Sequence, residues 1–311
     1  MTAPPLSTVV FDLGGVVLSW DPRLPYEQVM PAADVPQFLS RIDFENWNRA
    51  HDAGQPFEVG ERTLVERFPE AAGAVRAYRQ HYALSLTGMV PGTSAVIAEV
   101  QQAGLRLLAL TNWSAETFPH AQQRFGLLRR FESILVSGQE RLAKPDPAIF
   151  ELLARRHRLD PAECVFIDDS SANVAAAAEL GMTALRFVDA VTLRADLQRL
   201  GLLGERAVVT ESVFHLTEVE RWQSARETGG YMWSSRDVSY EQQGYVHCAF
   251  AAQVPGVRSR IYADLADDDL VLLELDPSTL EVVVEDLGAG EAFPHLYQPL
   301  PVTSVRAARP L

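Results

Sequence analysis

The sequence of 311 residues carries a formal net charge of −14, and 47% of its residues are hydrophobic. This length exceeds the size at which a single hydrophobic core usually keeps growing, so two domains are expected. The acidic balance argues against a protein that mainly neutralises a nucleic-acid backbone. The apolar stretches are too short or too interrupted to cross a bilayer, and the N-terminus has no basic segment followed by an apolar one. We therefore expect a cytoplasmic protein without nucleic-acid or membrane partners, whose oligomeric state the sequence leaves open.

From residue 7 to about residue 200, short apolar runs alternate with helical stretches, a pattern typical of βαβ units around a parallel sheet. The expected strands are residues 9–11, 105–110, 132–136, 164–167 and 183–187. Ligands of open parallel sheets bind beyond the carboxyl ends of the strands. The polar residues that follow these strands should therefore converge on one edge of the sheet: Asp12, Thr111, Asn112, Asp168 and Asp169.

Residues from about 22 to 88 interrupt this alternation, because they are rich in helix formers with amphipathic spacing and have no strand signal. They predict a helical insert after the first strand. Near residue 205 the pattern changes again and becomes strand-rich, with Gly and Pro at the turns. We expect an α/β domain over 1–204, with a Rossmann-like parallel sheet and the insert as a cap, and a smaller α+β domain over 205–311.

The residues expected at the sheet edge form a coherent set for phosphoryl transfer. The Asp12 carboxylate can attack phosphorus and form an acyl phosphate that water then hydrolyses. Because two anions must meet in this reaction, their charge has to be offset. Mg²⁺ held by carboxylates and a backbone carbonyl can offset most of it, and Lys144, Thr111 and Asn112 can bind the remaining phosphate oxygens.

Four segments, FDLGGVV, LTNWS, KPDPAIF and VFIDDSSANV, resemble the four ordered motifs of the haloacid dehalogenase superfamily. The resemblance covers residues 7 to about 200 and implies that the insert closes over the site and selects the substrate. It implies these roles: Asp12 as the nucleophile, Thr111 and Lys144 as phosphate ligands, Asp168 and Asp169 as magnesium ligands, and Gly14 as a magnesium ligand through its carbonyl.

The composition supports the assignment of Lys144 independently. Of the 27 basic residues it is the one lysine, and the other 26 are Arg. Arg and Lys differ in shape and hydration, so a chain that uses Arg elsewhere has kept one compact ammonium at the motif position.

The superfamily's phosphatases usually carry a second Asp two residues after the nucleophile, where it serves as general acid and base. Gly14 stands at that position. We favour a phosphatase of the sugar-phosphate type, in which FDLGG is a normal form, acting on a small phosphorylated metabolite. One alternative is a metal-independent 2-haloacid dehalogenase, which leaves Asp168 and Asp169 unexplained. The other is a non-catalytic protein that binds or senses a phosphorylated ligand.

Asp21 is a candidate for the missing acid. A flap hairpin formed by VVLSW would return its carboxylate toward the site. The competing interpretation is that Asp21 caps a turn before Pro22.

In the insert, the spacing of Trp47, Asn48, His51 and Asp52 places some of them on a common helix face. We expect substrate contacts from this group, with Trp47 and His51 as the named candidates. Trp47 also fits a role in the core.

After residue 210, the segments VFHLT, GYVHCAF and FPHLYQPLP resemble a small bacterial domain family of unknown function, with a fold similar to that of ADP-ribosyltransferases. The resemblance implies a nucleotide- or NAD-related role in which His215 bonds a nicotinamide ribose, with Tyr245 and His247 nearby. The alternative is that His215 and His247 are half-buried histidines satisfied by the backbone.

Overall fold

The computed structural model describes residues 5–288 and 290–311. Within these residues the chain forms two compact units. The first holds the described residues up to 93, 104–124 and 128–202, and the second holds 94–103, 125–127 and 203–311. The second unit thus includes residues 94–103 and 125–127 besides the expected C-terminal segment. The domain limits expected from the sequence stay a prediction.

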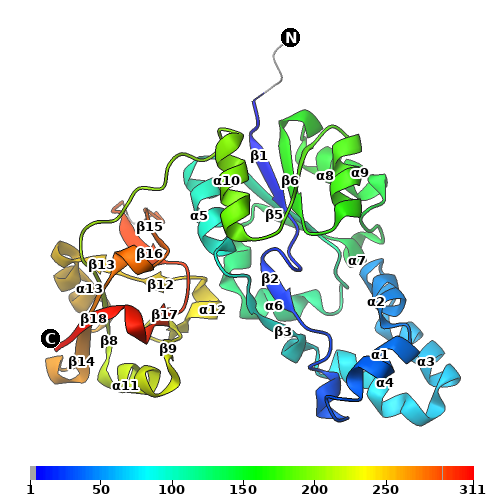
Figure 1. Cartoon of the computed structure of the whole chain (residues 1–311), viewed down its shortest axis with the longest axis horizontal. Helices are drawn as coiled ribbons and strands as arrows, with labels where there is room; N and C mark the ends of the chain where they lie inside the picture. Colours follow the sequence, from blue (N-terminus) through cyan, green and yellow to red (C-terminus); the bar gives the residue numbers. More distant parts are fainter. Residues whose placement is uncertain (1–4, 289) are drawn as a thin grey trace. The chain divides into compact units, whose positions relative to one another are not determined.

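A five-stranded parallel sheet forms the centre of the first unit (Figure 1), as expected. In the order β5-β4-β1-β6-β7, its strands are Ser133–Val136, Arg106–Thr111, Thr8–Phe11, Cys164–Asp168 and Thr183–Arg186. The residues of β1 and β6 are buried along their whole length, as in parallel sheets with both faces covered. In the β1 register, Phe11 pairs with Ala109 and Ile167. The residues that follow these three strands therefore meet at one edge.

Helices α8 (Pro147–His157) and α9 (Ser171–Glu179) lie together beside this sheet (Figure 1). Ile149 and Phe150 of α8 are fully buried in one cluster with Phe166 of β6. Asp146 accepts from the Ala148 N–H and Pro147 begins α8, so Asp146 caps the N-terminus of this helix. The remaining helices of this sheet domain are α6 (Phe118–Arg124), α7 (Ser137–Glu140) and α10 (Ala190–Arg199).

The insert after β1 is helical, as expected. Its helices are α1 (Val35–Arg41), α2 (Phe44–Asp52), α3 (Phe57–Arg67) and α4 (Ala72–Gln80). The expected flap differs in one respect: β2 (Leu18–Trp20) pairs with β3 (Leu86–Met89), at the far end of the insert, rather than within VVLSW. The two ends of the insert are thus joined by one antiparallel ribbon.

The second unit carries two larger antiparallel sheets and two two-stranded ones. Of the larger sheets, one has the order β13-β8-β14-β18 and the other β12-β16-β15. The strands of the first are Ala249–Phe250, Val213–Glu218, Leu270–Leu275 and Val305–Pro310, and those of the second are Val246–His247, Phe293–Leu296 and Val282–Glu285. The two-stranded sheets pair β10 (Trp233–Ser235) with β11 (Val238–Ser239) and β17 (Leu300–Pro301) with β9 (Gly230–Tyr231).

The helices of this α+β unit are α5 (Thr93–Gln102), which belongs to it from residue 94 on, α11 (Val219–Thr228), α12 (Tyr240–Gln243) and α13 (Val254–Ile261).

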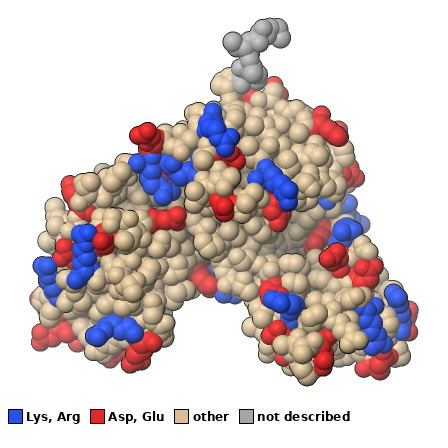
Figure 2. All heavy atoms as spheres, in the orientation of Figure 1, with Lys and Arg blue, Asp and Glu red and all other residues tan. Residues whose placement is uncertain are grey.

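Charged side chains of both signs are interspersed over the face drawn in Figure 2. Several of them form ion pairs at the surface, such as Arg156 with Glu140 and Arg258 with Asp267. None of the helices in the described residues is long and apolar enough to span a bilayer.

Candidate active site

Asp12 lies directly beyond β1, where the sheet register places it between the ends of β4 and β6. Its amide donates to the Ile167 carbonyl at 2.8 Å, and its Oδ1 accepts from the Leu13 N–H at 2.7 Å. Lys144 Nζ lies 2.9 Å from the same Oδ1. Burial raises the pKa of Asp12 to about 7, an effect that the charge of Lys144 opposes. A bound cation would favour the ionised, nucleophilic form in the same way.

Lys144 is fully buried at its ammonium end and has three acceptors. Besides Asp12, its Nζ donates to Asp168 Oδ2 at 2.6 Å and to the Leu110 carbonyl at 2.8 Å. Asp168 is itself fully buried and also accepts from Asn173 and from the Ser170 N–H. The lysine thus ties the ends of β1, β4 and β6 together through charge-assisted hydrogen bonds.

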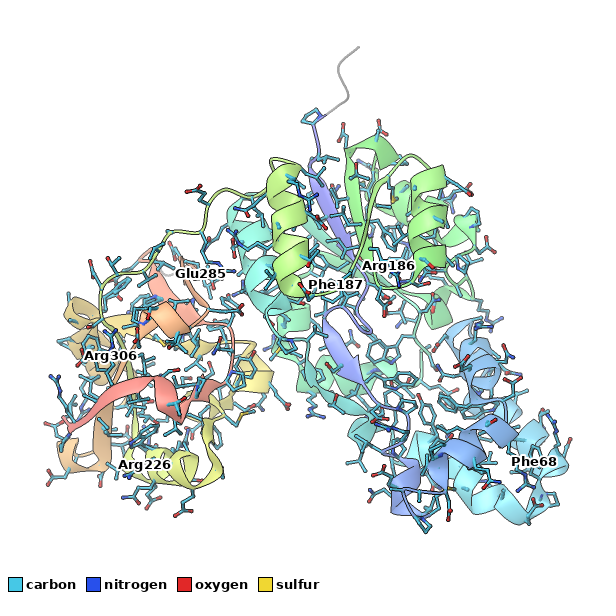
Figure 3. The ribbon with its side chains drawn as sticks, in the orientation of Figure 1. Phe68, Arg186, Phe187, Arg226, Glu285 and Arg306 are labelled. Carbon is cyan, nitrogen blue, oxygen red and sulfur yellow. The ribbon has the colours of Figure 1, made fainter. Side chains whose placement is uncertain are left out.

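Asp12, Asp168 and Asp169 each offer a carboxylate oxygen, and these oxygens lie within 4.8 Å of one another. Burial and the neighbouring Asp168 raise the pKa of Asp169. Arg186, labelled in Figure 3, donates to the Asp169 carbonyl at 3.4 Å. A set of hard oxygen ligands from carboxylates is what Mg²⁺ prefers, so the residues present fit this ion.

Thr111 and Asn112 stand at the end of β4. Asn112 is held by two bonds to the backbone of Lys144, one through each of its side-chain polar atoms, at 2.8 and 2.9 Å. The Thr111 hydroxyl is fully buried and has no hydrogen-bond partner in the described part of the chain. Such a hydroxyl can donate to a phosphate oxygen, because buried polar groups are otherwise satisfied.

A cavity of about 390 Å³ opens on this edge. Its lining includes Asp12, Gly14, Asn112 and Asp169 from the sheet domain, as expected from the sequence. Other lining residues come from the flap and the insert: Trp20, Asn48, Asp52, Tyr78 and Tyr82. The sheet edge therefore supplies the charged groups, and the insert supplies mostly aromatic and amide groups.

Asp21 is not among the residues that line this cavity. Its carboxylate is bound by Arg23, with Nε–Oδ1 at 2.9 Å, and the Arg23 N–H donates to the same oxygen. This ion pair lowers the pKa of Asp21. The arrangement favours the turn interpretation, and a role of Asp21 as the acid stays a prediction.

Trp47 and His51 are buried in the insert and are not among the residues that line the cavity. The His51 ring is fully buried, stacks on Phe57 at a centroid distance of 4.0 Å and bonds the Gln55 carbonyl through Nδ1. Trp47 packs against both His51 and Tyr78. The same helix places Asn48 and Asp52 in the cavity, because positions four apart share a face.

Sequence reasoning missed Tyr78 and Tyr82. They lie in and just after α4, about 30 residues from α2 in sequence, and no motif marks them. Burial raises the pKa of both phenols above the usual value. They reach the cavity only because α4 packs against the neighbouring helices.

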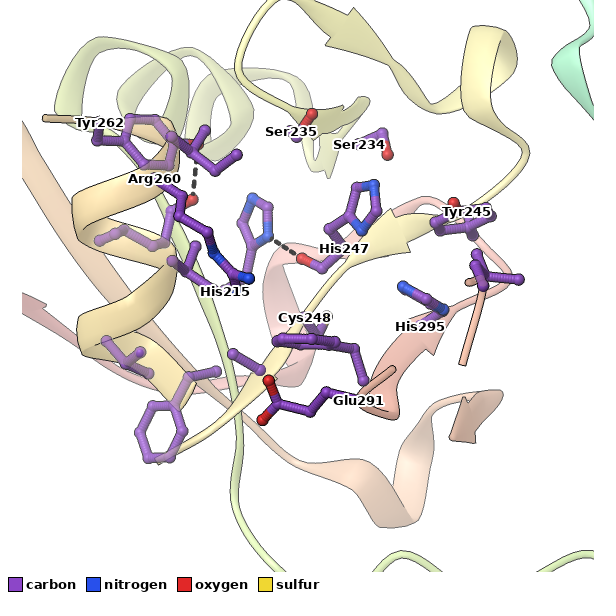
Figure 4. A pocket seen from close by; sticks show the side chains of 18 of the residues that line it. His215, Ser234, Ser235, Tyr245, His247, Cys248, Arg260, Tyr262, Glu291 and His295 are labelled. Atoms are coloured by element: carbon purple, nitrogen blue, oxygen red, sulfur yellow. Dashed lines mark hydrogen bonds between the residues drawn. The ribbon is translucent and has the colours of Figure 1, made fainter. Parts of the chain in front are cut away.

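In the second unit, His215, Tyr245 and His247 line one cavity of about 260 Å³ (Figure 4). The His215 Nδ1 lies 2.6 Å from the His247 carbonyl oxygen, and the ring centroids of Tyr245 and His247 are 4.9 Å apart. The structure thus brings the three candidates together. It adds His295, whose Nδ1 lies 3.0 Å from the buried Glu285.

The structure thus places a carboxylate, a buried lysine and paired acids at the carboxyl edge of a parallel sheet, an arrangement that suits a hydrolase. Comparison with known families agrees. The chain belongs to the haloacid dehalogenase-like hydrolases, whose family model matches residues 6–181. A second model, of a protein family of unknown function (DUF952), matches residues 216–308.

Named phosphatases are similar to part of the chain. The sesquiterpene phosphatase astK of Aspergillus oryzae is 22% identical over 199 residues, which cover 61% of this chain and 94% of that protein. A phosphoglycolate phosphatase of Vibrio vulnificus is 24% identical over 194 residues, covering 58% and 83%. Among solved structures, a HAD family enzyme from Bacteroides thetaiotaomicron superposes with a TM-score of 0.50 at 18% identity, covering 60% of this chain and 95% of that one. At this identity the structural likeness establishes the fold.

Proposed function

We propose that this chain is a magnesium-dependent phosphatase that hydrolyses a small phosphorylated metabolite through a phospho-aspartate on Asp12. The observation that carries the proposal is the cluster of Asp12, Asp168 and Asp169 oxygens within 4.8 Å of one another, next to the ammonium of Lys144. Mg²⁺ bound there would neutralise the charge that the phosphoryl group brings. Several relatives of the sheet domain are named as phosphatases, which supports the same reaction.

The protein's own residues divide the work. Asp12 attacks phosphorus, with its carboxylate already oriented by Lys144 and the Leu13 amide. The Thr111 hydroxyl orients a phosphoryl oxygen, the Lys144 ammonium offsets part of the negative charge, and the insert limits the access of water to the cavity. The sugar-phosphate class of substrate stays our proposal, since the mixed aromatic and amide lining suits a polar body with apolar faces.

Hydrolysis of 4-nitrophenyl phosphate tests the proposal. We expect turnover that requires Mg²⁺, stops in chelator and is lost in Asp12→Asn, with unchanged circular dichroism. Phosphate binding without turnover by the intact chain would instead indicate the non-catalytic sensor. Halide release from a 2-haloacid in chelator would indicate the metal-independent dehalogenase.

For the second unit, an ADP-ribosyltransferase-like fold with a nucleotide- or NAD-related role stays a prediction. The shared cavity of His215, Tyr245 and His247 supports a ligand-binding function. Titration of the intact chain with NAD tests it, and an absence of binding at millimolar NAD would count heavily against it.

A further inference from the structure

Within the described part of the insert, Asp52 is the one carboxylate that lines the catalytic cavity. Among the described residues, the acids that line this cavity are Asp12, Asp52 and Asp169. Asp12 and Asp169 belong to the acidic cluster at the sheet edge, whereas Asp52 ends α2 of the insert. Because Asp52 lines the cavity without belonging to the metal cluster, its carboxyl group can transfer protons there.

Asp52 is held in position from both sides of the cavity. Asn48 Nδ2 donates to its Oδ2 at 3.0 Å, and the Ser114 amide of the sheet domain donates to its carboxylate. The Asp52 carbonyl accepts from the Ser137 hydroxyl at 2.5 Å. These contacts anchor the end of α2 to the sheet edge, so a proton donor there would have a defined geometry.

We propose that Asp52 is the general acid and base of this enzyme, replacing the acid that is absent at Gly14. The proposal rests on the proposed phosphatase function. When an Asp12 oxygen bonds to phosphorus and the ester P–O bond breaks, Asp52 gives its proton to the departing oxygen, which leaves as an alcohol. Asp52 then takes a proton from water as the water oxygen bonds to phosphorus. The bond between phosphorus and Asp12 breaks, which releases inorganic phosphate and restores both carboxyl groups.

The environment of Asp52 suits both directions of proton transfer. Burial raises the pKa of Asp52 to about 7, the charge of Asp12 adds to the rise, and the Ser114 amide opposes it. An acid and base works best when its pKa lies near the working pH.

The variant Asp52→Asn, compared on two esters, tests the proposal. Phenol is a poor leaving group that needs a proton, and 4-nitrophenol leaves readily without one. We expect kcat/KM for phenyl phosphate to fall about 100-fold or more, with a loss of less than about 10-fold for 4-nitrophenyl phosphate. Because water attack also slows, the variant should release a burst of 4-nitrophenol equal to one per active site.

Asp34→Asn is the matched control, since Asp34 lies at the start of α1 in the same insert but is exposed, makes no capping bond and is outside the cavity. It should behave as the unmodified enzyme on both esters. Equal losses on the two esters in Asp52→Asn, or none, would overturn the role of Asp52 while leaving the phosphatase intact. An unmodified enzyme that turns over neither ester in Mg²⁺ would overturn the phosphatase function itself.

A separate observation concerns the cavity of the second unit, whose polar atoms call for a ligand. A carbonyl only accepts, so the bond to the His247 carbonyl fixes the proton of His215 on Nδ1. Burial lowers the pKa of His215 to about 4, which keeps the ring neutral. His215 is 2% exposed, and its Nε2 acceptor has no hydrogen-bond partner in the described part of the chain. The fully buried hydroxyl of Ser234, which also lines the cavity, likewise has no hydrogen-bond partner in the described part of the chain.

The charges that line this cavity limit the ligand to one negative group. Arg260 is its one Arg or Lys among the described residues, and Glu285 and Glu291 are also in the lining. In Figure 4 the Arg260 side chain extends from α13 toward His215. Much of the remaining lining of the cavity is apolar and includes Val257 and Phe293. The volume of about 260 Å³ suits a single ring.

We infer that this cavity binds a small aromatic acid with a hydroxyl group: the hydroxyl donates to His215 Nε2, the ring packs on the apolar walls and the acid pairs with Arg260. The probe is 4-hydroxyphenylacetate, measured on the intact chain by saturation-transfer NMR. We expect a Kd on the order of millimolar, as for a fragment-sized ligand. Two comparison ligands each lack one group: phenylacetate lacks the hydroxyl, and 4-hydroxybenzyl alcohol lacks the charge. Each should bind at least about 5-fold more weakly, because a lost hydrogen bond costs about 1 kcal/mol, which corresponds to that factor.

Arg260→Gln should remove the preference for 4-hydroxyphenylacetate over 4-hydroxybenzyl alcohol, and because Arg260 is exposed the variant should fold. An absence of binding, or equal binding of the three probes, would overturn the inference. Tight binding of NAD with no effect of 4-hydroxyphenylacetate as competitor would overturn it in favour of a dinucleotide.

Discussion

Lys144 is the residue on which the charge balance of the active site depends. Its ammonium contacts Asp12 and Asp168, whose carboxylates would otherwise repel each other in a buried place. It also donates to the Leu110 carbonyl, so its three protons all have acceptors. A point charge with three donors fits this position, and a planar guanidinium does not.

We therefore expect Lys144→Arg to lower kcat by about 100-fold, because the longer, planar group displaces Asp12 from its position of attack. The rate of 4-nitrophenyl phosphate hydrolysis measures the loss, and thermal unfolding checks that the variant is folded. If a folded variant kept more than a tenth of the activity, an ammonium at this position would not be required.

At the scale of elements, the short helix α7 fixes the loop that follows β4. The Ser137 hydroxyl accepts from the Trp113 amide at 2.9 Å, and the Gly138 amide donates to the Trp113 carbonyl at 3.1 Å. A Cβ on Gly138 would lie 2.5 Å from the Ala115 nitrogen and 2.7 Å from the Trp113 oxygen. Both are backbone atoms, so no side-chain rotation can relieve the overlap. Close contact of two backbones is the reason that glycine is needed here.

Gly138→Ala should lower the free energy of unfolding by about 1–3 kcal/mol and also impair activity, because Asn112 precedes the displaced loop. Gly73→Ala in α4 is the matched control, since a Cβ there meets nothing within 4 Å. That change should stabilise the protein by about 0.5–1 kcal/mol through helix propensity. Urea titration of both variants measures the difference, and equal effects would rule out the close approach at Gly138.

At the scale of the whole molecule, the net charge of −14 makes the cluster of three carboxylates a costly feature of the unbound fold. Burial and the charge of Asp168 raise the pKa values of two of the three, Asp12 and Asp169. A cation that binds the folded chain and not the unfolded one stabilises it by mass action.

Mg²⁺ at 100 times its dissociation constant should therefore raise the Tm by roughly 5–10 °C, and EDTA should reverse the change. Asp169→Asn should unfold at least as high as the unmodified chain without metal, because one repelling charge is gone, but should lose the shift with Mg²⁺. Differential scanning fluorimetry measures both. A full Mg²⁺ shift in Asp169→Asn would place the ion elsewhere.

The sequence alone determined the sheet domain and most of its catalytic edge. Five apolar runs, separated by helical stretches, predicted five parallel strands. Because ligands of such sheets bind beyond the carboxyl ends of the strands, Asp12, Asn112 and Asp169 were expected to lie together. These predictions needed only the local spacing of apolar residues, because the residues that follow the strands of a parallel sheet all lie at the same edge. The count of one lysine likewise singled out Lys144, which the structure finds buried between two carboxylates.

Only the tertiary structure decided which side chains of the insert face the cavity. Helix α2 carries Trp47, Asn48, His51 and Asp52. Successive residues of a helix point about 100° apart, so their spacing shows which of them share a face. It does not show which face is turned toward the core and which toward the cavity. Packing of α2 against Phe57 and neighbouring rings buries Trp47 and His51 and turns Asp52 to the site. Likewise, the proximity of Asp21 to Asp12 in sequence does not reveal the bond of Asp21 to Arg23. Local pattern thus determines the strands and the residues at their ends, whereas long-range packing decides which acid can complete the site.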